Sequence, residues 1–271
     1  MEKESSQERA QLEEVAKTIG YDALLEVTSK YGTGEWDIDL EISPTEKCLA
    51  YHNMSHTKRV RDASKQLAKL HGLPLYDQKL TSMIASAHDV IHERNDTQSA
   101  EQRSAEWLKN KMAAHGFSDE DIEIARLSIL GTTPILDTNG DLISQEFTLI
   151  PFPSQRAGEI ALCVAVADME ALFSAYAPTE AHNLYKERRG IPTQINPRDL
   201  DGFIAFQQEQ LHIYKTYQPL IRTLENAAGN LRLQLYNYHQ LLLKDVENGA
   251  VTTWNEIISR DTRFCQEFTQ K

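Results

Sequence analysis

The segment LYDQKLTSMIASAHDVIHE, residues 75–93, decides the fold class. Its apolar residues recur at intervals of three and four, which is the period of one face of an α-helix. They are Leu80, Ile84, Ala87 and Ile91. Asp77 is a candidate N-cap for this helix. The segment therefore predicts an amphipathic helix over 75–93 that carries His88, Asp89 and His92.

The same helical period runs through most of the chain. It predicts two short helices in 5–30 with an interruption at Gly20, a helix over 55–71, another over 99–115, one that begins at the N-cap Ser118, and a central apolar helix over 157–177. Residues 134–156 are the exception, because proline, Asn-Gly and β-branched residues predict a loop or insertion with a short hairpin. The expected architecture is all-α.

Two regions follow from this pattern. Residues 1–195 form the predicted helical domain, with the irregular insertion near 134–156. Residues 196–271 form a C-terminal extension, in which 199–248 predicts two long amphipathic helices. These helices either pack on the core or form the surface of a homodimer.

Composition limits the classes of function. The chain has 271 residues, of which 40 are acidic and 28 basic, for a net charge of −12. This charge repels a nucleic-acid backbone, so general nucleic-acid binding is not expected, although a small phosphorylated substrate is compatible with it. Three widely separated cysteines and the lack of a long apolar run predict a cytoplasmic protein without a membrane segment.

Histidines and aspartates form the candidate functional site. In YHNMSH, residues 51–56, His52 and His56 stand four positions apart and share a face if the stretch is helical; His88 and His92 are spaced alike. Asp168 lies within the apolar run ALCVAVADMEALF, where a buried carboxylate requires a cation, a metal or a hydrogen-bond partner.

The order of these elements resembles the HD superfamily of metal-dependent phosphohydrolases. YHNMSH and HDVIH are similar to elements of cyclic-nucleotide phosphodiesterases, and the four runs YHNMSH, HDVIH, AEQRSA and ADME are similar to those of smaller predicted HD phosphohydrolases. The resemblance covers about residues 48–175 and implies an HD-type helical bundle. Ile91 departs from the phosphodiesterases, which have an acidic residue there.

The resemblance also implies roles for individual residues. It makes His56, His88, Asp89 and Asp168 the ligands of a divalent metal. His52 is then the general acid, and His92 lies near the attacking water or a second metal. Glu101 and Ser104 either support the ligands or are structural.

Such a site has a definite chemistry. A mixed imidazole and carboxylate shell suits Mn²⁺, Fe²⁺, Zn²⁺, Co²⁺ or Ni²⁺ better than Mg²⁺, which stays in the set of candidates. The ion lowers the pKa of a bound water from about 15.7 toward roughly 7. Lys58, Arg59 and Arg103 are candidate contacts for the substrate phosphate. The expected activity is hydrolysis of a small phosphate ester, with nucleotides as the first class.

Two alternatives stay open at the level of the sequence. Some HD relatives hold two irons and oxidise a small polyol or phosphonate, for which His92 and His115 are the candidate extra ligands. The other alternative is a regulatory module that binds a nucleotide or metal without turnover.

Overall fold

The structure, a computed structural model, describes a defined part of the chain. The described residues are 6–32, 49, 51–93, 97–136, 138, 142–169, 183–184, 187, 200–205, 207–208, 211–212 and 231–269. The chain divides into two compact units, one of residues 1–135 with 145–168 and one of residues 136–144 with 169–271. The predicted domain boundary at 195 lies outside the described residues.

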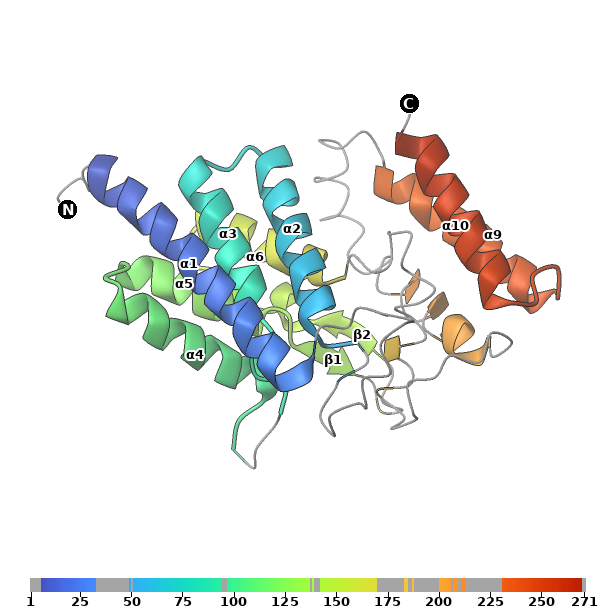
Figure 1. The fold of residues 1–271 in the computed structure, drawn as a ribbon, viewed down its shortest axis with the longest axis horizontal. Coiled ribbons are helices and arrows are strands. Elements are labelled where there is room, and N and C mark those ends of the chain that lie inside the picture. Colours follow the sequence, from blue (N-terminus) through green and yellow to red (C-terminus); the bar gives the residue numbers. More distant parts are fainter. Residues whose placement is uncertain are drawn as a thin grey trace. The chain divides into compact units, whose positions relative to one another are not determined.

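The first unit is a bundle of α-helices (Figure 1). Its helices are α1 (Ser6–Tyr31), α2 (Met54–Leu70), α3 (Leu75–Ala87), α4 (Ala100–Ala114), α5 (Asp119–Leu130) and α6 (Gln155–Asp168). Helix α3 packs against each of the other five, and α6 packs against α2, α3 and α5. The predicted all-α fold class is confirmed for the described residues.

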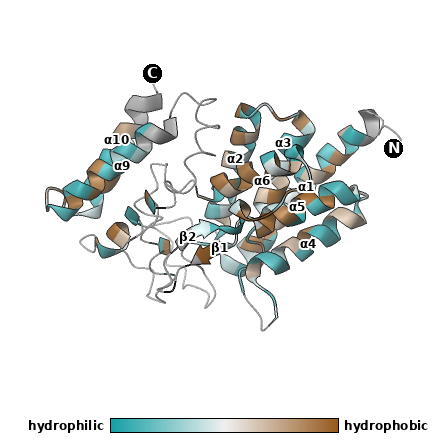
Figure 2. Ribbon diagram, turned by 180° about the vertical axis from the view of Figure 1, so that it is seen from behind, coloured by the Kyte–Doolittle hydropathy of each residue, from teal (hydrophilic) through white to brown (hydrophobic). Residues whose placement is uncertain are grey.

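Helix α6 forms the centre of the core of this unit. Every residue from Ile160 to Ala167 is buried, as the apolar run predicts. Figure 2 shows apolar residues along α6 and on the neighbouring helices. The helix ends at Asp168 and Met169 lies in a turn, so the predicted helix is confirmed only to Asp168. Residues 170–177 of that prediction lie outside the described part of the chain.

The prediction of two short N-terminal helices is wrong. Helix α1 runs without a break through Gly20, because this glycine lies where α1 crosses α3. A Cβ at Gly20 would lie 3.4 Å from Ser86 Oγ and 3.6 Å from Met83 Cα. A glycine costs about 1 kcal/mol in a helix interior, and the close packing of the two helices offsets that cost.

The other helix boundaries follow local capping. The predicted helices over 55–71 and 99–115 and the N-cap Ser118 are confirmed to within a residue. The predicted N-cap Asp77 is wrong, because α3 begins after Pro74 and Asp77 lies in its first turn. The Asp77 carboxylate instead accepts hydrogen bonds from Arg156 Nε and Nη2 at 3.0 and 2.8 Å. Arg156 also pairs with Asp121 at 2.6 Å, so one guanidinium joins α3, α5 and α6.

The segment between α5 and α6 contains the predicted hairpin. Strands β1 (Pro134–Leu136) and β2 (Leu142–Gln145) form a two-stranded sheet, and the 3₁₀ helix η1 (Glu146–Thr148) follows. Of the turn, only Thr138 is among the described residues.

The second unit contains two antiparallel helices, α9 (Leu231–Glu247) and α10 (Trp254–Thr269). Tyr238 stacks on Phe264 with ring centroids 4.2 Å apart, and Arg260 pairs with Asp245 at 2.6 Å. Phe203, from a helical stretch at 201–205, packs edge-on against Trp254. The two predicted helices over 199–248 are described only in part, since 213–230 lie outside the description. Among the described helices, none combines the length and apolar character needed to cross a membrane.

Candidate metal centre

The start of α2 sets the direction of His56. Asn53 is the N-cap, and its Oδ1 accepts hydrogen bonds from the backbone N–H groups of Ser55 and His56 at 3.0 and 3.2 Å. Its Nδ2 donates to the carbonyl of Leu49 at 3.2 Å. His52 therefore precedes the helix, and only His56 of the two histidines is helical.

The end of α3 sets the direction of His88. The prediction that the helix continues to residue 93 is wrong, because α3 ends at Ala87 and His88 is its C-cap. His88 and His92 consequently do not share a helix face. His88 Nδ1 lies 2.7 Å from the carbonyl of Ala85. A donor at Nδ1 leaves Nε2 as the bare ligand atom, as in many metal-binding histidines.

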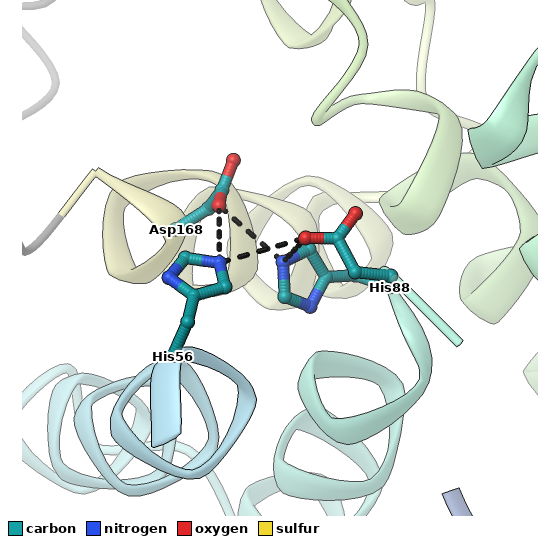
Figure 3. Close-up of side chains that lie close together, drawn as sticks. His56, His88 and Asp168 are labelled. Carbon is teal, nitrogen blue, oxygen red and sulfur yellow. Dashed lines mark ion pairs between the residues drawn. The ribbon is translucent and has the colours of Figure 1, made fainter. Parts of the chain in front are cut away.

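Four side chains converge on one point between α2, α3 and α6 (Figure 3). They are His56, His88, Asp89 and Asp168. His88 Nε2 lies 2.9 Å from Asp89 Oδ2 and 3.3 Å from Asp168 Oδ1. His56 Nε2 lies 3.5 Å from each of the same two oxygens.

These separations fit a shared cation. Two ligands that each lie about 2.1 Å from one ion are about 3.0 Å apart at a right angle and about 3.4 Å apart in a tetrahedron. His56 and His88 are buried, and within the described part of the chain their Nε2 atoms make no aligned hydrogen bond despite the nearby carboxylates. A buried polar atom of this kind needs a partner, and a divalent metal supplies one.

The pKa shifts within the cluster also favour a bound cation. Burial alone lowers the pKa of His88, but the carboxylates of Asp89 and Asp168 outweigh it and hold that pKa well above its usual range. Burial would raise the pKa of Asp168, yet His56 and His88 lower it to about 2; Asp89 is also held well below its ordinary pKa. Two ionised, partly exposed carboxylates thus lie beside His88, whose raised pKa favours its protonated form without metal. A divalent metal would take the place of that proton.

His52 and His92 lie beside this cluster. Their rings stack with centroids 4.0 Å apart, and His52 Nε2 lies 4.0 Å from Asp89 Oδ2. The backbone N–H of His92 donates to the Tyr31 hydroxyl at 2.7 Å. Tyr31 in turn donates to Glu93 Oε2 at 3.0 Å, and burial raises the pKa of Tyr31 to about 12. No sequence pattern pointed to Tyr31, which lies 61 residues before its partner.

Helix α4 holds the segment that follows the His88–Asp89 pair. The Ser104 hydroxyl accepts from the backbone N–H of Ile91 at 3.0 Å and donates to its carbonyl at 3.1 Å. Arg103 Nη1 donates to the carbonyl of Glu93 at 2.9 Å. Ser104 and Arg103 therefore both hold the backbone of the segment that follows the His88–Asp89 pair. Glu101 Oε2 is buried without a hydrogen-bond partner among the described residues.

The other candidate phosphate contacts lie on α2. Arg59 is half-buried, one turn after His56. Lys58 is exposed and lies about 200° around the helix from His56, away from the cluster. His115 is the exposed C-cap of α4.

Gln145 is a neighbour of the cluster that sequence reasoning missed. Its Nε2 donates to Asp168 Oδ2 at 2.9 Å. The residue lies in the segment interpreted as an insertion, where no periodic pattern singles it out.

Comparisons with known proteins leave the family unassigned. No protein-family model and no curated protein matches the chain. Among the solved structures that are similar to it are two that each have 16% sequence identity and a TM-score of 0.48. One is a protein from Lactobacillus plantarum, for which the match covers 87% of this chain and 96% of that one. The other is YpgQ from Bacillus subtilis, in complex with ADP, with coverage of 86% and 97%.

Proposed function

We propose that this chain is a metal-dependent phosphohydrolase of the HD superfamily type that hydrolyses a small phosphate ester, with nucleotides as the first class to test. The observation that carries the proposal is the convergence of His56, His88, Asp89 and Asp168, whose ligand atoms all lie within 4.8 Å of one another. Two neutral nitrogen ligands and two carboxylates favour Mn²⁺, Fe²⁺, Co²⁺, Ni²⁺ or Zn²⁺.

The surrounding residues have distinct roles in this proposal. A bound divalent metal supplies an activated water and polarises a phosphoryl oxygen. His52 is the general acid, because it is partly exposed at the rim of the cluster and its Nε2 is 4.0 Å from Asp89 Oδ2. His92 stacks on His52 and holds the orientation of its ring. Arg59 is the cation that we assign to the substrate phosphate, since it follows His56 by one helical turn.

The exposure of His115, one of the two candidate extra ligands, disfavours the oxygenase alternative. His115 is exposed at the end of α4, whereas His56 and His88 are buried. A second redox metal at His115 would therefore lie in solvent.

The test compares metal content and turnover in matched variants. Protein purified without chelator is analysed for metals and screened for phosphate release from nucleotides and sugar phosphates with Mn²⁺, Co²⁺ or Ni²⁺. We expect Asp89→Asn to lose both metal and turnover, while Asp62→Asn, an exposed aspartate on α2, keeps both. His52→Ala should keep the metal and lose about 10²- to 10⁴-fold in rate. If Asp89→Asn retains metal and rate, the proposal is wrong; two bound irons without phosphate release would favour the oxygenase.

A further inference from the structure

The two oxygens of the Asp168 carboxylate have different partners. Oδ1 lies 3.5 Å from His56 Nε2 and 3.3 Å from His88 Nε2, which are ligand atoms of the candidate metal centre. Oδ2 accepts a hydrogen bond from Gln145 Nε2 at 2.9 Å. Gln145 is only 3% exposed, so its amide faces the protein interior and not the solvent.

The backbone around Gln145 is fixed on its C-terminal side. The backbone N–H of Glu146 donates to the carbonyl of Thr133 at 2.9 Å, and that of Phe147 donates to the carbonyl of Gly131 at 3.0 Å. Phe147 is buried and its ring packs on Phe152 with centroids 5.4 Å apart. The end of the hairpin is therefore anchored to the end of α5, and Gln145 presents its amide from a rigid base.

The Asp168 carboxylate needs a hydrogen-bond donor to fix its orientation. It is the last residue of α6, and its side chain is 20% exposed, more than that of either histidine. The torsion that turns an aspartate carboxylate has a broad energy profile, so packing alone does not fix which oxygen faces a ligand site. A donor on one oxygen selects the orientation and leaves the other oxygen for the ion.

We propose that Gln145 is a positioning residue of the metal centre, which holds Asp168 so that Oδ1 is the oxygen presented to the metal. The inference rests on the metal centre of the proposed function but not on the hydrolysis of any substrate. Hydrogen-bond partners that orient a ligand typically change metal affinity 10- to 100-fold when they are removed.

The experiment measures the binding of Co²⁺ alone to purified, metal-free protein. Titration calorimetry gives the dissociation constant, and the visible absorption of bound Co²⁺ reports the number and geometry of its ligands. Gln145→Met keeps the length of the side chain and removes the donor; Gln145→Glu keeps the shape and replaces the donor by an acceptor. The matched control is Gln155→Met, which removes an exposed amide that bonds Glu159 at the start of α6. Thermal unfolding without metal shows whether each variant is folded.

We expect Gln145→Met to bind Co²⁺ about 10- to 100-fold more weakly than wild type, with an altered absorption spectrum. Gln145→Glu should also change the spectrum, because the added carboxylate, a third beside Asp89 and Asp168, displaces Asp168 or competes with it for the ion. Gln155→Met should match wild type in both readouts. If either Gln145 variant is folded and keeps the wild-type affinity and spectrum, the positioning role is overturned while the metal centre stands. If wild type binds no Co²⁺, both are overturned, and tight binding without phosphate release would overturn only the hydrolase.

Discussion

Asp168→Asn gives a quantitative test of the charge balance in the cluster. In the metal-free protein, His56 and His88 lower the pKa of Asp168 from 3.8 to about 2. That difference corresponds to about 2 kcal/mol of folding stability at neutral pH, as an upper value because the side chain is partly exposed. Because the pKa is depressed in the folded state, this contribution is complete above the ordinary pKa and is lost as the pH falls from about 5 toward 2. Asparagine has the same shape and removes it.

The assay is urea unfolding followed by circular dichroism, in chelator, between pH 3 and 7. We expect Asp168→Asn to be destabilised by up to about 2 kcal/mol at pH 7, with the difference from wild type shrinking as the pH falls below 4. Asp62→Asn, the exposed control, should stay within about 0.5 kcal/mol of wild type. Equal stability of Asp168→Asn and wild type across this range would refute the charge pairing.

Two further predictions concern the fold around the site and the second unit. Arg156→Met leaves Asp77 and Asp121, which are 3% and 5% exposed, without their cation, so we expect the free energy of unfolding in urea to fall by about 3–5 kcal/mol. The triple variant Arg156→Met, Asp77→Asn, Asp121→Asn should recover part of this loss. A loss below about 1 kcal/mol in Arg156→Met would contradict the role of this network. Burial raises the pKa of Asp261 to about 7, so ionisation of this carboxyl lowers the stability of the folded protein increasingly from about pH 4 to pH 7. Burial lowers the pKa of His239 to about 4, so the contribution of this histidine to stability increases from about pH 4 to pH 6.5. The two trends therefore oppose each other. Asp261→Asn should therefore be more stable than wild type at pH 8 and gain stability between pH 4 and 6.5, and unfolding midpoints that follow wild type would contradict this.

The helices were predictable because their signals are local. Apolar residues of α2 and α4 repeat every three or four positions, and Ser99 and Ser118 carry the capping signals of the helices that they begin. Spacing and the apolar run drew attention to the histidines and to Asp168, but the set of four metal ligands was what the resemblance to HD phosphohydrolases implied. The expectation that His88 and His92 share a helix face was wrong.

The errors in prediction arose where distant residues decide local structure. The helical pattern of 75–93 continues past Ala87, but Ser104 bonds both backbone groups of Ile91 and replaces the helical hydrogen bonds there. Gly20 predicts a helix break from sequence alone, because the packing of Ser86 against this glycine is visible only in the structure. Gln145 and Tyr31 form hydrogen bonds with residues 23 and 61 positions away, and the periodicity of a sequence does not indicate such distant pairs.

The positions of the candidate ligands relative to their helices argue for a cation more strongly than their identities do. His88 is the C-cap of α3 and Asp168 is the last residue of α6, so the negative ends of two helix dipoles lie near the cluster. A carboxylate is unfavourable at a helix C-terminus, and a second ionised carboxylate, Asp89, stands next to it. His56, in the first turn of α2, brings only one positive helix end. Selection for helix stability alone would put a lysine or arginine where Asp168 stands. A divalent metal bound between the three helix ends would offset the unfavourable interaction of Asp168 and Asp89 with the helix C-termini.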